Sequence, residues 1–406
     1  MQIYLDYSAT TPPRPEAIAA MQATLGQHWG NPASLHHWGN RAATVLEQAR
    51  AQVAALINAP MDAIVFTAGG TEADNLAILG VAQNYHRPKH IIISSVEHSA
   101  IAEPVRRLAD QGWAVTRLPV DQAGRVNPQD LQAALTAETV LVSVIYGQSE
   151  VGTLQPIVEL GAIAQDHGAW FHTDAVQVAG RLLLDMEALP VDLLSLSSHK
   201  LYGPQGAGAL YIRPGCALMP LLGGGGQEFG LRSGTPALPA IAGFGVAAEL
   251  AGQELPTETL RLIQLRDRLF HHLADYAGLT VTGDRRQRLP HHVSFCLTTA
   301  DGETVSGKTL VRQMNLAGIG ISAGSACHSG KLSPSPILKA MGYGDRAAKC
   351  GIRLTLGRQT TPDDVDWAAL ALRQVLERTL PQPVHGLKIC PMTRRASVRC
   401  NFRCHG

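Results

Sequence analysis

The sequence carries almost no net charge, with a formal value of +1 at pH 7 over 406 residues. Proteins that bind nucleic acid usually present a strongly basic surface, so this balance argues against a nucleic-acid partner. The chain also lacks any apolar run long enough to cross a bilayer. Its first residues lack the basic stretch followed by an apolar stretch that marks a secretory signal. We therefore expect a cytoplasmic globular protein with no membrane span.

A disulfide framework is missing as well. The chain has seven cysteines, an odd number at irregular spacings. In a reducing compartment such residues are either small buried apolar side chains or reactive thiols, and only their surroundings decide between the two. The cysteines are Cys216, Cys296, Cys327, Cys350, Cys390, Cys400 and Cys404.

Short apolar runs alternate with helical segments through the first 255 residues. Near-continuous apolar strands in this alternation indicate an α/β fold with a mostly parallel sheet between helices, and ligands bind such sheets at the carboxyl ends of the strands. The expected strands are 64–67, 90–95, 114–118, 140–145, 170–173 and 191–196.

The length favours two domains. We place a boundary at Glu254-Leu-Pro256-Thr257, which separates an expected helix at 240–250 from a charged helix at 260–276. The large domain would span 15–255, and a smaller α+β domain would combine 1–14 with 256–386. The remainder, 387–406, is basic and contains three cysteines without a Cys-x-x-Cys pair, so we expect a disordered extension rather than a metal site.

A lysine follows the strand at 191–196, in Ser195-Leu-Ser197-Ser198-His199-Lys200. Lysine is the side chain that forms an imine with a carbonyl cofactor, and hydroxyl and imidazole donors beside it can hold a phosphate. A surface lysine after a buried strand would give the same local pattern. The interpretation of Lys200 therefore depends on the other motifs.

Polar residues follow several other expected strands. Gly69-Gly70-Thr71 opens a helix, where unpaired N–H groups and the helix dipole favour an anion; a simple N-cap turn is the alternative. His98, Glu150 and Asp174 each follow a further strand end. Their convergence would place several charged and polar groups in one crevice.

One cysteine stands in a loop of small residues, Ser322-Ala-Gly324-Ser-Ala-Cys327-His328-Ser-Gly-Lys331. Neighbouring imidazole and ammonium groups lower the pKa of a thiol and favour the thiolate, and small polar loops are poor burial sites. This pattern favours Cys327 as a nucleophile over an inert buried thiol.

Together these motifs resemble the pyridoxal-phosphate-dependent cysteine desulfurases, a branch of the class-V, fold-type I aminotransferase-like enzymes. The resemblance runs from Tyr4 to Arg358. Six spaced motifs carry it: Gly70-Thr71-Glu72-Ala-Asp74-Asn75, Glu97-His98, Asp174-Ala-Val-Gln177, Ser198-His199-Lys200-Leu-Tyr-Gly-Pro, Arg232-Ser-Gly-Thr235 and Gly324-Ser-Ala-Cys327.

The resemblance implies pyridoxal 5'-phosphate as cofactor and a sheet of the seven-stranded type. Lys200 would form the Schiff base, Asp174 would pair with the pyridinium nitrogen, and Gln177 would bond the phenolic oxygen. His98 would stack on the ring and shuttle protons. The phosphate would be held by Gly70, Thr71, Ser197 and His199, joined by Thr235 of the partner in a homodimer.

For the substrate, the resemblance implies L-cysteine, with Arg353 gripping its carboxylate beside Ser149. Cys327 would take the sulfur as a persulfide, leaving L-alanine, and pass it to an acceptor or scaffold protein for iron–sulfur clusters or another thio-cofactor. No metal is implied. Many relatives have asparagine where this chain has Ser149, so that contact with the cofactor is in doubt.

Two alternatives stay open. A related selenocysteine lyase or cysteine/cystine C–S lyase would share the cofactor site without needing the thiol of Cys327. A non-catalytic scaffold would keep the fold and bind a sulfur-transfer partner. The acceptor and the choice between sulfur and selenium are not encoded in any motif we identify.

Overall fold

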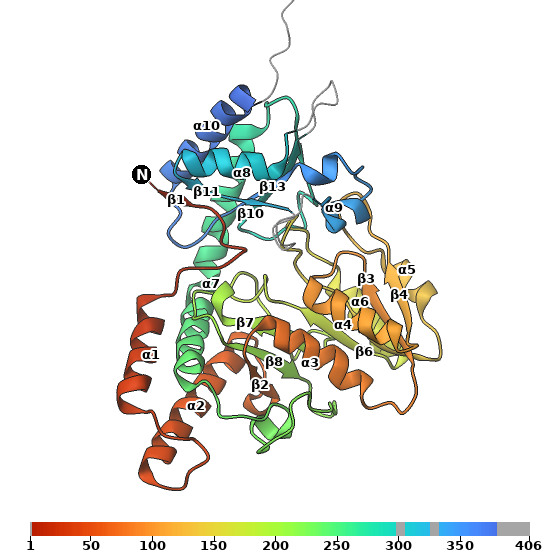
Figure 1. The fold of residues 1–406 in the computed structure, drawn as a ribbon, viewed down its shortest axis with the longest axis vertical. Helices are drawn as coiled ribbons and strands as arrows, with labels where there is room; N and C mark the ends of the chain where they lie inside the picture. The colour runs from red at the N-terminus through yellow and green to blue at the C-terminus, as the bar shows by residue number, and fades with distance from the viewer. Residues whose placement is uncertain (1, 298–304, 325–332, 380–406) are drawn as a thin grey trace, which may run out of the picture.

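The computed structural model describes residues 2–297, 305–324 and 333–379. The expected nucleophile Cys327 and the basic extension at 387–406 therefore lie outside the described residues. Within the described part, the two larger of three sheets pack on separate hydrophobic clusters, and one long helix joins them (Figure 1).

The larger sheet has seven strands in the order β2-β8-β7-β6-β5-β3-β4. Four neighbouring pairs, from β7 across to β4, are parallel. The expected α/β class with a mostly parallel sheet is confirmed. The strands are β2 (Ile64–Thr67), β3 (His90–Ser94), β4 (Ala114–Leu118), β5 (Thr139–Ser143), β6 (Trp170–Asp174), β7 (Leu193–Ser197) and β8 (Gly208–Ile212).

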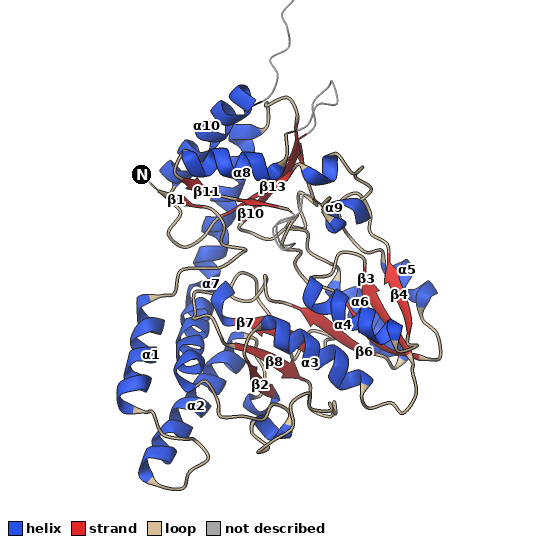
Figure 2. Ribbon diagram, viewed as in Figure 1, coloured by secondary structure: helices blue, strands red, loops and turns tan. Residues whose placement is uncertain are grey.

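Helices cover both faces of this sheet, as Figure 2 shows. Alternate residues of a strand point to opposite faces, so Ile92 packs with one hydrophobic cluster while its neighbours Ile91 and Ile93 pack with another. On one side lie α1 (Pro15–Gln27), α2 (His37–Leu56), α5 (Pro128–Ala134), α6 (Ile157–His167) and the first half of α7 (Leu238–Leu273). On the other side lie α3 (Gly70–Ala82) and α4 (Ser99–Asp110).

Strand β8 was not expected from the sequence. It runs antiparallel to both neighbours, β7 and β2. β8 follows β7 after the tight turn at Lys200, with no α-helix between them. The sequence analysis recognised strands by their alternation with helices, and β8 lacks that signal. Because β8 reverses direction, β2 and β7 run the same way, and their carboxyl ends meet at one edge of the sheet.

The smaller sheet has the order β12-β13-β10-β9, and a two-stranded sheet pairs β1 with β11. The sequence pattern indicates strands at 281–282, 292–296 and 351–355 and a helix at 306–317, and all four elements are present, three of them with slightly different bounds. The elements are β1 (Ile3–Tyr4), β9 (Leu279–Val281), β10 (His292–Leu297), α8 (Gly307–Leu316), β11 (Ile319–Gly320), β12 (Ser322–Ala323), α9 (Pro336–Ala340), β13 (Gly351–Thr355) and α10 (Pro362–Thr379).

The helix break expected at Pro256 is wrong: α7 continues without interruption from Leu238 to Leu273. Its first half packs against the large-sheet cluster as far as Ala251, and its second half enters the small-sheet cluster at Leu262. The division into 15–255 against 1–14 with 256–386 stays a prediction, and this change of core supports it. Any boundary there is crossed by a helix rather than by a flexible linker.

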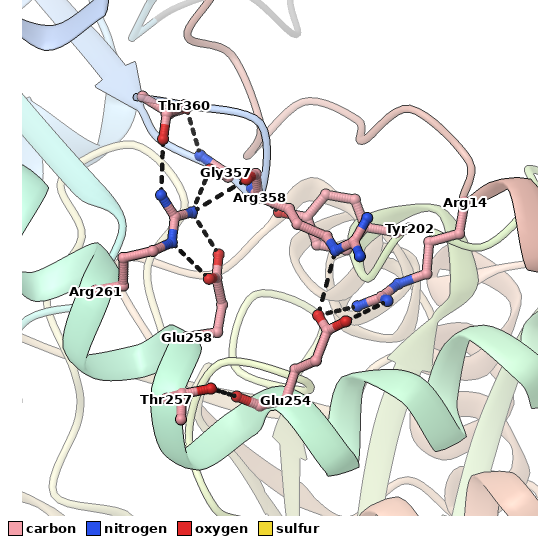
Figure 3. A network of polar contacts seen from close by, with 9 residues as sticks. All are labelled: Arg14, Tyr202, Glu254, Thr257, Glu258, Arg261, Gly357, Arg358 and Thr360. Carbon is pink, nitrogen blue, oxygen red and sulfur yellow. Dashed lines mark hydrogen bonds and ion pairs between the residues drawn. The ribbon is translucent and has the colours of Figure 1, made fainter. Parts of the chain in front are cut away.

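Tertiary contacts compensate for the proline (Figure 3). Arg14 donates to both carboxylate oxygens of Glu254, at 2.8 and 2.6 Å, and Thr257 donates its hydroxyl to the Glu254 carbonyl at 3.0 Å. One turn later, Arg261 binds Glu258 and the carbonyl of Gly357. Proline removes one helical hydrogen bond, but the Arg14–Glu254 ion pair before it and the hydrogen bond from Arg261 to Gly357 after it tie the helix to distant parts of the chain.

In the part of the chain that the structure describes, none of the helices combines the length and apolar character that crossing a bilayer requires.

Candidate active site

A cavity of about 370 Å³ lies at the carboxyl ends of the large-sheet strands. It is walled by the turns after β2, β3, β5, β6 and β7, and by β12 and β13 of the smaller sheet. Residues predicted from the sequence contribute most of its lining: Gly70, Thr71, His98, Ser149, Asp174, Gln177, Ser197, His199, Lys200 and Arg353. Glu150, expected at the same crevice, is not among the lining residues.

Lys200 ends a short 3-10 turn after β7. Its Nζ donates to the carbonyls of Ser8 and Ala9, each at 2.7 Å. Arg181 donates to the Lys200 carbonyl at 2.8 Å and so fixes the backbone behind the side chain. The amine is thus held at the cavity wall by two backbone carbonyls.

Asp174 is the last residue of β6, and its Oδ1 accepts from Val176 N at 2.9 Å. Burial raises the pKa of this carboxyl, while the charges of His98 and Lys200 lower it. Gln177 donates its amide to the Ser8 carbonyl at 2.9 Å. Within the described residues the buried Gln177 Oε1 has no hydrogen-bond partner, so the amide is only partly satisfied.

A set of donors gathers at the amino end of α3. Gly70 lies where an added Cβ would meet Val176 Cγ2 at 2.8 Å, so only glycine allows helix and sheet to approach this closely. Thr71 and Ser197 line the same end of the cavity. Burial, with the charge of Lys200, lowers the pKa of His199 to about 4, so its imidazole is neutral. This end suits a phosphate.

His98 caps the amino end of α4. Its Nδ1 accepts from Ala100 N at 3.2 Å, so the neutral ring carries its proton on Nε2. Since the cap fixes the ring at the cavity wall, Nε2 is the atom through which His98 can exchange protons there.

Arg353 lies on β13 with only 7% of its surface exposed. It donates to the Ser149 carbonyl at 3.0 Å and to Asp6 Oδ1 at 3.2 Å. Its Nε has no partner among the described residues. Ser149 therefore contributes through its backbone, which any residue at this position would supply. Asp6, which the sequence analysis did not single out, holds the guanidinium in place.

Buried carboxyls behind the cavity were also missed. Asp74 lies on α3 and lines the cavity, and burial raises the pKa of Glu97 to about 8. Both belong to motifs quoted for the family resemblance, but nothing in the sequence shows that the two carboxyls are buried together. Among the described residues, no group of three or more His, Cys, Asp or Glu side chains is arranged to hold a metal ion.

Thr235 is exposed and does not line the cavity of its own chain. The loop that carries it is tightly anchored. Glu228 accepts from Arg50 at 2.8 and 2.9 Å and from Phe66 N at 2.8 Å, although Glu228 and Phe229 both have positive φ. Such φ values are strained in residues other than glycine, so the ion pair holds the loop in this shape.

Replacing Glu228 with glutamine is expected to lower the free energy of unfolding by about 3 kcal/mol, because buried Arg50 would lose the charge of its buried partner and keep only that of the more exposed Glu47. Urea denaturation measures this. Glu103→Gln, at an exposed pair with Arg106, should leave the midpoint unchanged. Equal midpoints for Glu228→Gln and the parent protein would show that the buried pair does not hold the loop.

The three described cysteines are poor nucleophiles. Burial raises the pKa of Cys216 to about 11 and that of Cys296 to about 12. Cys350 is buried and donates its thiol to the Arg346 carbonyl at 3.1 Å. Ser322, on the strand β12 that precedes the Cys327 segment, lines the cavity. A reactive thiol must therefore be sought among the residues that the structure does not describe.

The donor set fits pyridoxal phosphate. The cavity offers a lysine amine, a carboxylate at a strand end, a partly unsatisfied glutamine and a neutral imidazole beside a helix N-terminus. Fold and cavity together indicate a class of protein, an α/β enzyme whose cavity has the donors to bind an anionic carbonyl compound beside a lysine.

Comparison with known proteins agrees. The family model described as aminotransferase class-V matches residues 3–367. A cysteine desulfurase IscS of Dictyoglomus turgidum is 42% identical over 379 residues, covering 93% of this chain and 95% of the relative. That of Methylococcus capsulatus is 42% identical over 382 residues, covering 93% of each. The chain belongs to the class-V aminotransferase family, within its cysteine desulfurase branch.

Solved structures agree as well. One described as a NifS-like protein has a TM-score of 0.86 at 32% identity, covering 93% of this chain and all of the other. One described as SspA in complex with cysteine has a TM-score of 0.77 at 33% identity, covering 88% of this chain and 99% of the other. The family resemblance inferred from the six motifs is confirmed.

Proposed function

We propose that this protein is a cysteine desulfurase that uses pyridoxal 5'-phosphate to convert L-cysteine to L-alanine and stores the sulfur as a persulfide on Cys327. The observation that carries the proposal is the cavity in which Lys200, Asp174 and Arg353 come together. Lysine supplies the imine, aspartate faces a ring nitrogen, and arginine binds a carboxylate. These are the three charged contacts that an amino acid joined to the cofactor needs.

The cofactor's phosphate would lie at the amino end of α3, bound by Gly70, Thr71, Ser197 and His199. Gln177 would bond the phenolic oxygen. When bound, pyridoxal phosphate supplies an electron sink that allows the C–H and C–S bonds of the amino acid to break heterolytically. The Ser8 and Ala9 carbonyls hold the Lys200 amine when it is not bonded to the cofactor, and His98 exchanges protons through Nε2.

The substrate's carboxylate would bind Arg353, whose orientation is fixed by Asp6 and by the Ser149 carbonyl. The thiolate of Cys327 attacks the substrate sulfur. The C–S bonding pair stays with the carbon, which takes up a proton to become the methyl group of alanine. Sulfur leaves as the outer atom of a Cys327 persulfide, ready for transfer to an acceptor or scaffold protein.

The functional unit would be a homodimer: Thr235 is exposed on an anchored loop and, among the described residues, does not line the active-site cavity of its own chain. In the dimer, Thr235 of the partner would add a hydroxyl to the phosphate site. The sulfur would supply iron–sulfur clusters or another thio-cofactor, as the family resemblance implies.

The test is product analysis. The full-length protein, supplied with pyridoxal phosphate, L-cysteine and a thiol reductant, should release alanine and sulfide in equal amounts. Formation of pyruvate and ammonia instead would identify a C–S lyase and reject the proposal. No observation in the described residues favours that alternative or a selenocysteine lyase.

Replacing Arg353 with lysine is expected to raise KM for L-cysteine by about 10- to 100-fold, with a smaller change in kcat. The loss of one charge-assisted hydrogen bond of about 1.5–3 kcal/mol gives this range. Arg358→Lys is the matched control, since Arg358 pairs with Glu254 outside the cavity. An unchanged KM in Arg353→Lys would place the substrate carboxylate elsewhere.

A further inference from the structure

Asp74 is a buried carboxyl of the cavity for which the proposed mechanism gives no role. It lies one turn into α3, is 1% exposed and lines the cavity. Its Oδ1 stands 3.8 Å from Nε2 of His172 and, among the described residues, has no hydrogen-bond partner. A carboxylate this deep would normally collect several donors.

The groups that act on Asp74 come from three neighbouring parts of the fold. From β6 come His172 and Asp174, from β7 comes the hydroxyl of Ser195, and the turn after β3 contributes Glu97. The charge of Lys200 acts on Asp174, and so does that of His98 when its ring is protonated. No cation acts on Asp74 among the described groups that shift its pKa.

His172 does not supply a positive charge. Its Nδ1 lies 2.8 Å from Ser143 Oγ, and its Nε2 lies 3.0 Å from Ser195 Oγ. Burial lowers the pKa of this imidazole to about 3, so the ring is neutral at physiological pH. The contact between His172 and Asp74 is therefore not an ion pair.

Three buried carboxyls thus influence one another, and the cation Lys200, with His98 when that ring is protonated, acts on Asp174 rather than on Asp74. Burial raises the pKa of Asp74 well above its ordinary value, the charges of Asp174 and Glu97 add to this, and the Ser195 hydroxyl opposes it. Like charges at such a site cannot all ionise, and the carboxyl that faces the cations keeps its charge most easily.

We propose that Asp74 is protonated at neutral pH and, as the neutral partner in a buried carboxyl pair, leaves Asp174 the ionised member that faces the cofactor ring. Asp74 is then a positioning residue: it fills the space behind Asp174 without adding a second negative charge. Its effect on the ring rests on the proposed function, whereas the proton on Asp74 is a property of the protein itself.

The proposal fixes the sign of a pH effect. A carboxyl that binds its proton more tightly in the folded than in the unfolded state costs stability as pH rises from its unfolded pKa, about 3.9, towards its folded pKa. Asparagine has the shape of a neutral aspartic acid and cannot ionise. Asp74→Asn should therefore gain stability relative to the parent protein as pH rises.

The experiment compares melting temperatures of full-length protein at pH 5 and pH 8, with and without added pyridoxal phosphate. The melting temperature of Asp74→Asn minus that of the parent should be higher at pH 8 than at pH 5 by at least about 2 °C. If the melting-temperature difference between Asp74→Asn and the parent at pH 8 is equal to or smaller than the difference at pH 5, the proposal is overturned. Asp192→Asn is the control: Asp192 is buried but paired with Arg213, so its replacement should destabilise the protein at both pH values.

Two further measurements test the proposal if the variant does not fold or if the cofactor site is affected. If Asp74→Asn does not fold, infrared spectra of the parent protein with ¹³C-labelled aspartate decide: a protonated aspartic carboxyl persisting at pH 8 supports the proposal, and its absence overturns it. Affinity for pyridoxal phosphate should change less than threefold in Asp74→Asn, and a larger loss overturns the role of Asp74. If the parent protein binds no cofactor, the proposed function fails, while the melting temperatures still decide the proton on Asp74.

Discussion

Replacing Lys200 with alanine is expected to abolish alanine production and covalent attachment of pyridoxal phosphate. Loss of a group that bonds the cofactor and moves protons should lower turnover by at least about a thousandfold. The fold should survive, because the Lys200 backbone is held by Arg181 and the side chain donates to two backbone carbonyls, those of Ser8 and Ala9. Amino-acid analysis of the products and borohydride reduction of the bound cofactor measure the two effects.

The matched control is Lys339→Ala, at an exposed lysine paired with Asp345, which should leave both readouts unchanged. Lys200→Ala should still bind the cofactor non-covalently through the donors at the amino end of α3 and through Asp174. If Lys200→Ala retained more than a small fraction of the parent's turnover, another amine would have to form the imine.

The second large effect is expected at Cys327. Cys327→Ser should keep the covalently bound cofactor but lose desulfuration by about a hundredfold or more, because a serine hydroxyl is not ionised at neutral pH and cannot form a persulfide. Alanine release in the presence of reductant and detection of protein-bound persulfide by mass spectrometry are the two measurements.

Cys216→Ser and Cys296→Ser are the controls, since burial raises the pKa of both thiols and leaves them protonated. Neither change should affect sulfur transfer. Undiminished turnover in Cys327→Ser would mean that sulfur leaves without a protein thiol, as in a selenocysteine lyase or a C–S lyase. The cavity would then serve a different final step with the same cofactor.

The large sheet was predictable because its signal is local. An apolar strand followed by an amphipathic helix is visible in one pass along the chain, and the rule on carboxyl ends then brings Lys200, Asp174 and His98 together. Strand β8 lacked that signal, since it joins β7 by a turn. The continuity of α7 through Pro256 depended on Arg14 and on the turn at 357–360, segments far away in the sequence.

The chemistry of the cavity was only partly predictable. Residue types that hold a cofactor are recognisable in motifs, whereas the environment that sets their charge is tertiary. Asp6, from the first strand region, meets Arg353 near the other end of the chain. The pKa of Glu97 is raised by burial that its sequence neighbours do not reveal. These groups could be found only once the fold had brought them together.

The most direct test of the central claim is the visible absorbance spectrum of the full-length protein with pyridoxal phosphate, recorded before and after addition of L-cysteine. The account predicts a band from lysine-bound cofactor that changes on mixing with L-cysteine and returns as alanine is released, and that is missing in Lys200→Ala. A protein that shows no such band after reconstitution, or a band that L-cysteine leaves unchanged, would contradict the account and favour a non-catalytic scaffold.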